Sequence, residues 1–339
     1  MEQPISLAGM LPSELTKYLE ALPRFRVNQI YKWIIRGIQE FDQMTDIPNS
    51  MREDFKNRFS LYSSKIENCL TEKDTKKIIL LLKDGLKIEC VLLSNGKKRL
   101  TACLSTQAGC PAKCVFCKTG SRGFHRNLAY TEIAEQFLHL NRTDPIDNIV
   151  VMGMGEPLLN LPELRKAINF FTDPHGLNFS RRRITVSTCG ICEGLFDIAK
   201  NGPYIKLALS LATADEPLRQ KLMPVTIANP LKKIKEGLAL FQQNGGGRIT
   251  LEVPLFGGIN TREADAKSIR EFSKGINSVV NIIPWNPVAG LEFEGKPLRE
   301  PNKAEIENYV KLLESQNLKV TKRLHKGRNI LGACGQLGE

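Results

Sequence analysis

Beyond residue 120 the chain alternates between short apolar runs typical of strands and longer amphipathic segments typical of helices. Strands are expected at 149–152, 183–187, 205–211, 249–253 and 279–283. Helices are expected near 131–140, 161–171, 194–201, 230–244, 263–274 and 303–316. This alternation favours a parallel sheet covered by helices, because parallel strands need crossover connections. We therefore expect an α/β fold of about six strand–helix units, a partial barrel with its functional residues at the carboxyl ends of the strands.

The first part of the chain follows a different pattern. Apolar residues at helical spacing predict a small helical domain, and basic residues between them suit an accessory RNA-binding role. Short β-like runs follow at 76–82, 86–93 and 100–105. Asp84-Gly85 and Asn95-Gly96 stand between these runs and are typical of hairpin turns. We expect an N-terminal helical accessory domain over 1–74 and, over 75–339, the partial (β/α)6 barrel with a β-hairpin extension and a C-terminal tail.

Basic residues outnumber acidic ones along the whole chain. There are 48 Lys and Arg against 36 Asp and Glu, which gives a formal net charge of +12. Such an excess forms a solvated surface or meets a polyanionic partner, because basic proteins release counterions from phosphate backbones. No apolar run is long enough to span a membrane, and residues 1–10 lack the pattern of a secretory signal. We expect a cytoplasmic protein that makes no membrane contact.

A cysteine cluster suggests a metal centre. Cys110, Cys114 and Cys117 form a CxxxCxxC pattern within eight residues. Three thiolates leave one iron of a four-iron cluster open, and an open iron can chelate an amine and a carboxylate. A zinc knuckle is the alternative, and it would need a fourth ligand such as His125. The cysteines at 69, 90, 189 and 192 are expected to be structural, although Cys189 and Cys192 form a CxxC pair that could hold a second metal.

These motifs lead to a resemblance. The CxxxCxxC pattern resembles that of the radical S-adenosylmethionine (SAM) superfamily, and the wider context resembles the RlmN/Cfr ribosomal RNA methyltransferases. The similar segments run almost end to end: FRVNQIYKWI, FDQMTDIPNSMRE, CLSTQAGCPAKCVFCKTG, GFHRNL, VVMGMGEPLLN, RRRITVSTCG, NIIPWNP and ACGQL. The N-terminal segments and GFHRNL are more similar to RlmN than to Cfr. The resemblance implies a radical SAM barrel with a [4Fe-4S] cluster on the three clustered cysteines.

The resemblance also implies an activity, the methylation of an adenine carbon in RNA. In the RlmN branch this carbon is C2 of a specific adenosine in the peptidyl transferase centre of 23S rRNA, with an adenosine of tRNA anticodon loops as a candidate second substrate. Two SAM molecules are used per turnover. Cys334 would receive a methyl group and join the RNA covalently through it. Cys103 would resolve that intermediate through a transient disulfide with Cys334, and Glu89 would accept a proton.

Family contacts to SAM carry over onto residues that follow the predicted strands. They are Gly155, Glu156, Ser187, Ser210, Leu211, Ala212 and Asn286. The carboxylate of Glu156 suits the ammonium group of SAM, and a glycine beside it permits a close backbone approach. The family often has His or Asn where Ala212 stands, so only a backbone contact is expected there.

The implied partners are 23S rRNA, tRNA and an electron donor such as flavodoxin, with the chain itself a monomer. Phosphate contacts are expected from basic groups at Arg122, Arg126, 181–183 and 322–328, unless these form a solvated surface. The C8 chemistry of the Cfr branch uses the same catalytic residues and stays open. So do a non-catalytic iron–sulfur or zinc RNA-binding protein and a radical SAM activase acting on a protein.

Overall fold

The computed structural model describes residues 4–96, 99–142, 145–323 and 326–338. A ten-stranded sheet runs through it in the order β16-β13-β12-β11-β10-β9-β6-β5-β4-β3. From one edge to the other these strands are β16 (Val320–Lys322), β13 (Ser278–Pro284), β12 (Ile249–Leu255), β11 (Lys206–Ser210), β10 (Ile184–Thr188), β9 (Asn148–Val151), β6 (Leu100–Cys103), β5 (Lys87–Ser94), β4 (Thr75–Leu81) and β3 (Lys65–Glu72).

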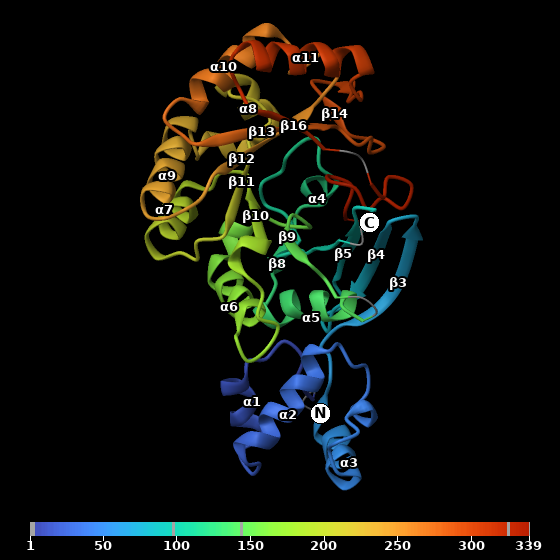
Figure 1. The fold of residues 1–339 in the computed structure, drawn as a ribbon. Coiled ribbons are helices and arrows are strands. Elements are labelled where there is room, and N and C mark those ends of the chain that lie inside the picture. The colour runs from blue at the N-terminus through green and yellow to red at the C-terminus, as the bar shows by residue number, and fades with distance from the viewer. Residues whose placement is uncertain (1–3, 97–98, 143–144, 324–325, 339) are drawn as a thin grey trace.

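The strands from β6 to β16 are parallel, and a helix connects each to the next. The connecting helices are α5 (Tyr130–Leu140), α6 (Leu161–Thr172), α7 (Cys192–Asn201), α9 (Leu231–Gln243), α10 (Glu263–Ser273) and α11 (Lys303–Ser315). They lie on the outside of a curved sheet whose inner side surrounds α4 (Lys118–Ser121) (Figure 1). The predicted α/β fold with a partial (β/α)6 barrel is confirmed, with β16 as a seventh parallel strand.

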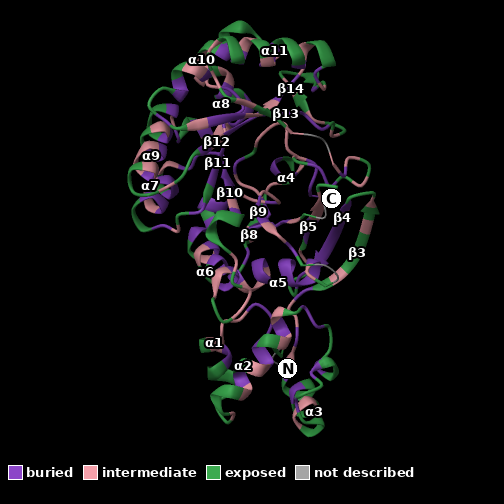
Figure 2. Ribbon diagram, viewed as in Figure 1, coloured by how far each residue is buried: buried purple, intermediate pink, exposed green. Residues whose placement is uncertain are grey.

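The periodicity that predicted these helices also explains how they pack. On α6 the residues at three- and four-residue spacing, Leu161, Leu164, Ile168 and Phe171, are all buried, and the exposed residues fall between them. Most residues of the barrel strands are buried, which is why these strands are rich in Val, Ile and Leu (Figure 2). Among the described residues no helix combines the length and apolarity that a membrane crossing requires.

The strands at the other end of the sheet are antiparallel. β3, β4, β5 and β6 pair in succession, and the Leu82 N–H donates to the Leu86 carbonyl (2.8 Å) to close the predicted turn at Asp84-Gly85. The extension therefore has one strand more than the sequence predicted. β3 had been expected inside the N-terminal domain, because its polar and half-exposed residues give no clear strand signal. It pairs with β4, so the large sheet begins before residue 74.

The N-terminal unit is small and mainly helical. It contains β1 (Ile5–Ser6), α1 (Pro12–Tyr18), α2 (Arg24–Ile35), the 3-10 helix η1 (Phe41–Gln43), α3 (Asn49–Arg58) and β2 (Phe59–Ser60). Its helices enclose Leu15, Ile30, Ile34 and Phe55, and it lies below α5 in Figure 1. The remaining short elements are β7 (Gln107–Gly109), β8 (Phe124–Asn127), η2 (Pro157–Asn160), η3 (Arg181–Arg183), α8 (Glu216–Leu222), η4 (Pro224–Ile227), β14 (Glu292–Phe293) and β15 (Lys296–Pro297).

A buried carboxylate joins the N-terminal unit to the barrel. Glu135 of α5 is fully buried and accepts hydrogen bonds from the Ser63 N–H (2.7 Å), the Ser64 N–H (2.9 Å) and the Ser64 hydroxyl (2.6 Å). Tyr31 of α2 adds a second link, because its hydroxyl donates to Asp173 after α6 (2.8 Å). Burial raises the pKa of Glu135 to about 7, although the serine donors act against that shift.

Glu135 should make stability depend on pH. Its pKa is about 7 in the folded chain and 4.5 ordinarily, so the folded state holds the proton more tightly. This stabilisation is fully present below pH 4.5 and is lost as the pH rises towards 7, by up to about 1.4 kcal/mol per pH unit. In urea titrations at several pH values, Glu135→Gln should remove this slope. Glu236→Gln, at an exposed position on α9, should keep it. Equal slopes in both variants would contradict the role given to Glu135.

Candidate active site

The loop that carries the three clustered cysteines lies between β7 and α4. Hydrogen bonds hold it on both sides, from the Cys110 N–H to the Gly123 carbonyl (2.8 Å) and from the Val115 N–H to the Leu222 carbonyl at the end of α8 (3.0 Å). Gly120 allows α4 to approach closely, since a Cβ there would lie 2.9 Å from the Cys114 carbonyl oxygen. The loop is therefore held by contacts to the chain on both of its sides.

The thiols of this loop suit a cluster better than a single ion. Among the residues described, no three His, Cys, Asp or Glu side chains lie close enough together to hold one metal ion. In an iron–sulfur cluster each thiolate binds a different iron, so the sulfurs need not converge on one point. Donors near Cys117 support this fit, because the backbone N–H groups of Gly120 and Thr119 favour its thiolate and lower its pKa.

Burial keeps these thiols protonated in the absence of metal. It raises the pKa of Cys110 to about 12 and that of Cys114 well above the usual value of 9.0. It also raises the pKa of Cys117, against the hydrogen bonds from Thr119 and Gly120. Because metal ligation requires thiolates, cluster assembly must release these protons.

Gly155 and Glu156 lie in the turn that follows β9. Gly155 has a φ of +99°, and a Cβ would lie 2.6 Å from the Gln107 side chain, so both backbone conformation and packing require glycine. The buried Glu156 carboxylate accepts from the Leu158 N–H (3.0 Å), the Thr188 hydroxyl (2.7 Å) and the Cys189 N–H (2.7 Å). The predicted SAM contact thus has a structural task as well, because it ties the end of β9 to the end of β10.

The other predicted SAM contacts also lie at the carboxyl ends of strands, as expected. The hydroxyls of Ser187 on β10 and Ser210 on β11 hydrogen-bond each other (3.2 Å). Leu211 and Ala212 follow Ser210, and both donate their N–H to the Glu252 carbonyl of β12. The Ala212 carbonyl accepts from the Asn260 amide (2.9 Å). Both polar backbone groups of Ala212 are therefore already engaged within the protein, which leaves little of the expected backbone contact.

The C-terminal tail folds back onto the cysteine loop. The Lys118 N–H donates to the Gly335 carbonyl (2.9 Å), and the Thr119 hydroxyl donates to the Leu337 carbonyl (2.6 Å). Asn286, which follows β13, donates its amide to the Cys334 carbonyl (3.0 Å). Asn286 was predicted from sequence as a SAM contact, and here it positions the backbone of Cys334.

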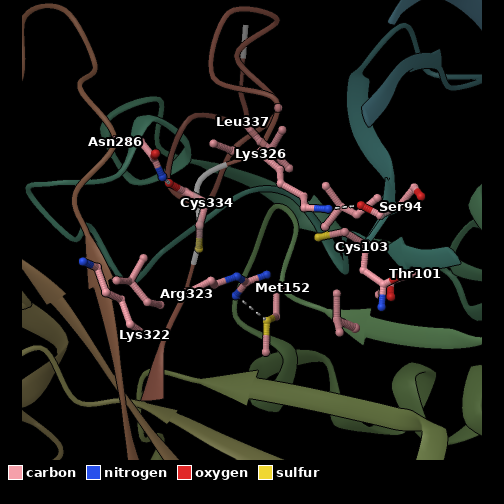
Figure 3. Close-up of a pocket in the computed structure, with 16 residues that line it drawn as sticks. Ser94, Thr101, Cys103, Met152, Asn286, Lys322, Arg323, Lys326, Cys334 and Leu337 are labelled. Carbon is pink, nitrogen blue, oxygen red and sulfur yellow. Dashed lines mark hydrogen bonds between the residues drawn. The ribbon is translucent and has the colours of Figure 1, made fainter. Parts of the chain in front are cut away.

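This folding brings Cys103 and Cys334 to one cavity of about 480 Å³. Cys103 comes from the end of β6 and Cys334 from the tail, and Figure 3 shows both sulfurs within the cavity with Arg323 near them. All nine cysteines are free thiols. Of the predicted SAM contacts only Asn286 is among the residues that line this cavity. Two cysteines 231 positions apart in sequence thus line one cavity, whereas the other predicted SAM contacts do not line it.

The surroundings of the cavity favour the neutral form of both thiols but place a cation near them. Burial raises the pKa of Cys103 to about 12. Cys334 is exposed at the cavity wall, and the partial loss of water around its sulfur raises its pKa to about 11. The Arg323 guanidinium favours both thiolates and so acts against these shifts. Arg323 also lies 3.9 Å from a Glu252 carboxylate oxygen and 3.8 Å from the Met152 sulfur. A thiolate that forms during a reaction would therefore have a counterion at hand.

Glu89 lies near this cavity but does not line it. Val91 of β5 pairs with Cys103, so Glu89, two residues earlier, shares the sheet face of Cys103. Its carboxylate is buried and forms an ion pair with the fully buried Lys77 of β4, with Nζ 3.5 Å from Oε2. The Lys77 ammonium also lies 3.5 Å from the Leu331 carbonyl, three residues before Cys334. The buried Glu89 is thus linked to the tail through Lys77.

Two cationic residues of this region were not predicted from the sequence, Lys77 and Arg219, and Arg323 was predicted only as a phosphate contact within 322–328. Each has one apolar and one polar neighbour in the sequence, which is a weak signal in a chain with many basic residues. Arg126, which was predicted to contact RNA, instead pairs with Glu132 through two hydrogen bonds (2.7 and 2.8 Å) and with Asp84 (2.5 Å). In contrast, 181–183 are exposed. In the 322–328 group, residues 324 and 325 lie outside the described residues.

The comparisons with known proteins agree with this arrangement. Residues 104–267 match the Radical SAM superfamily, and residues 5–61 match the Ribosomal RNA large subunit methyltransferase N-terminal domain. A radical SAM methyltransferase from Sphaerobacter thermophilus superposes with a TM-score of 0.92 at 32% identity, over 98% of this chain and 99% of that chain. The fold and the cysteine loop therefore define a radical SAM protein, a class that implies SAM and an iron–sulfur cluster.

Relatives whose names state their family identify one family within this class. A probable dual-specificity RNA methyltransferase RlmN from Treponema denticola is 48% identical over 98% of this chain and 95% of its own length. The protein of the same name from Treponema pallidum strain Nichols is 42% identical over 100% of this chain and 99% of its own. The chain belongs to the RlmN family of radical SAM RNA methyltransferases.

How firmly the C-terminal tail is held against the barrel can be tested at Gln336. Its amide donates to the Pro287 carbonyl (3.0 Å), and its oxygen accepts from the Ala333 N–H (3.3 Å). Gln336→Leu keeps the volume but loses both bonds, each worth about 1 kcal/mol net. Amide hydrogen exchange of residues 333–338 should become about thirtyfold faster. Gln243→Leu, at an exposed end of α9, is the matched control and should change nothing there. Unchanged exchange in Gln336→Leu would mean that other contacts hold the tail.

Proposed function

We propose that this chain methylates C2 of an adenosine in 23S rRNA and of an adenosine in tRNA, through a methylated Cys334 and a covalent protein–RNA intermediate. One observation carries this proposal: Cys103 and Cys334, far apart in sequence, face the same cavity beside the cysteine loop. Two thiols are what such a route needs, one to carry the carbon and one to release it. The word "dual-specificity" in the names of the relatives supports two kinds of RNA substrate.

The proposed chemistry assigns a task to each residue. The Cys334 thiolate takes a methyl group from one SAM, which leaves as S-adenosylhomocysteine. When bound, a [4Fe-4S] cluster on Cys110, Cys114 and Cys117 and a second SAM supply the radical chemistry that removes one hydrogen atom from this methyl group. The carbon then bonds to adenine C2, and the C2 hydrogen leaves as a proton, for which Glu89 is the proposed acceptor, and one electron, which the cluster that cleaved SAM would take back.

Cys103 completes the sequence. Its thiolate attacks the Cys334 sulfur, a disulfide forms, and the sulfur–carbon bond breaks. The carbon leaves with the bonding pair and takes up a proton, which gives the methyl group of the product. The disulfide must then be reduced by two electrons before another turnover. Arg323 is placed to stabilise the Cys103 thiolate that starts this step.

The RNA must present a splayed-out base at the cavity. Lys322, Arg323 and Lys326 line it and provide positive charge at the wall formed by the tail. A second contact is proposed on the N-terminal unit, where the exposed Phe25 of α2 lies between Arg24 and Arg26, with the Arg26 guanidinium over its ring (5.2 Å). An exposed aromatic ring flanked by arginines suits stacking and phosphate contacts in RNA. We propose a flavodoxin-type protein as the electron donor.

The identity of the product tests the proposal. Anaerobic turnover with methyl-labelled SAM, using unmodified transcripts of a large-subunit rRNA fragment and of tRNA, should give 2-methyladenosine by mass spectrometry of the nucleosides. Protein without RNA is the blank. 8-Methyladenosine would assign the chain to the C8 chemistry instead. No methylated nucleoside from protein with an intact cluster and a working reductant would refute the proposal.

The cysteine and glutamate variants should stop the reaction at different points. Cys334→Ala should form no product and no crosslink. Cys103→Ala should accumulate a protein–RNA crosslink, detected as a shifted band that persists under denaturing conditions, because the step that releases the carbon is lost. Glu89→Gln should still methylate Cys334 but should lower product formation at least 100-fold. Cys69→Ala, at an exposed position, is the matched control and should behave as wild type. A Cys103→Ala enzyme that releases free product would refute the role given to Cys103.

A further inference from the structure

Arg219 is the largest side chain that the fold buries completely. It lies on α8, and its guanidinium donates four hydrogen bonds. They go to the Leu211 carbonyl (2.9 Å), the Thr226 hydroxyl (2.6 Å), the Cys189 carbonyl (2.6 Å) and the Ser210 carbonyl (3.2 Å). Arg219 therefore connects the carboxyl ends of β10 and β11, where four of the predicted SAM contacts lie.

All four acceptors are neutral, so the charge of Arg219 is not cancelled by its hydrogen bonds. Within the described part of the chain no carboxylate lies at ion-pair distance from it. Glu216, one turn earlier on α8, uses a carboxylate oxygen to accept from the Leu231 N–H (2.9 Å). Burial lowers the pKa of Arg219, yet an arginine stays protonated in proteins. A buried cation without an ion pair is costly, and packing alone does not explain why this site holds a charge.

The charge of Arg219 acts on the cysteine loop. The last carbonyl of α8, at Leu222, accepts from Val115 beside Cys114, and Arg219 lies one turn before it. Glu156 is also connected to this loop, because its N–H donates to the Gln107 side chain (2.8 Å), three residues before Cys110.

The two charges are joined through a single residue. The Cys189 N–H donates to Glu156 (2.7 Å), and the Cys189 carbonyl accepts from Arg219 (2.6 Å). The end of β10 thus holds a buried anion and a buried cation, both close enough to the loop to change the energetics of its thiols. Few solvent dipoles are available to screen either charge at this depth.

We propose that Arg219 is a positioning residue that favours the reduced form of the iron–sulfur cluster, and that Glu156 opposes it. The inference rests on the proposed function only in taking Cys110, Cys114 and Cys117 as cluster ligands. A thiolate-bound cluster is already anionic, and reduction adds one electron from a low-potential donor. A buried cation stabilises that added charge, whereas a buried carboxylate disfavours it, and local charge is one of the factors that set cluster potentials.

The test is a potential measurement that needs neither RNA nor turnover. The full-length protein is reconstituted anaerobically with iron and sulfide, and the cluster is titrated with dithionite and mediators while electron paramagnetic resonance follows the reduced form. In Arg219→Gln the equilibrium constant for one-electron reduction should fall at least tenfold, which is a potential lower by 59 mV. Arg219→Lys keeps the charge and should keep the wild-type potential. Arg165→Gln, which removes an arginine paired with Asp197 (2.9 Å), should also leave it unchanged.

Glu156→Gln provides an independent measurement if Arg219→Gln does not fold or does not hold a cluster. It removes the opposing charge and should raise the potential. The proposal is overturned if Arg219→Gln retains the wild-type potential, if Arg219→Lys shifts it as much as Arg219→Gln, or if Glu156→Gln lowers it. A chain that makes no methylated RNA but shows the expected shifts would refute the proposed function and leave this inference standing.

Discussion

The pairing of β6 holds this structure together. β6 hydrogen-bonds antiparallel to β5 on one side and parallel to β9 on the other, so a single short strand joins the β extension to the barrel. Its last residue is Cys103, and the chain then passes directly into β7 and the cysteine loop. The position of one candidate catalytic thiol and the entry to the cluster loop therefore depend on the same ladder of hydrogen bonds. The C-terminal tail is then fixed against elements that this ladder has already placed.

Burial determines the chemistry of the candidate site. Every thiol that the proposed reaction uses is kept protonated by its surroundings, so each requires a metal, a cation or a bound partner before it becomes a thiolate. The same burial makes the few charges inside the barrel effective over longer distances. Lys77, Arg219 and Arg323 are each within reach of a carboxylate or a thiol that the proposed chemistry uses. The reaction site is thus shaped by cations inside the fold, while most of the basic excess of the chain stays on the surface.

The parts of the fold that follow from local periodicity were predictable, and the parts that follow from tertiary contacts were not. The alternating segments after residue 120 predicted the barrel, because the strands are mainly apolar and each helix has one apolar face. β3 was missed because its half-exposed, polar residues carry no alternation. The cysteine motif predicted a metal site, and the family pattern predicted that Cys103 and Cys334 act together. Two features could not be predicted, because they depend on residues that only folding brings together. One is the set of hydrogen bonds that Glu156 accepts from Thr188 and Cys189, and the other is the position of the Arg219 charge behind the cysteine loop.

The hydrogen bonds by which Glu135 of α5 joins the N-terminal unit to the barrel have a geometrical consequence for substrate choice. Glu135 accepts hydrogen bonds from the backbone N–H groups of Ser63 and Ser64 and from the Ser64 hydroxyl, and Tyr31 adds a further link to Asp173. The N-terminal unit is thereby attached as a spacer of fixed length and direction and cannot swing on a flexible linker. An RNA that touches both the aromatic ring at Phe25 and the thiol cavity must span that separation with its own folded shape. Selection between RNAs can then rest on their tertiary architecture, with no reading of nucleotide sequence by the protein.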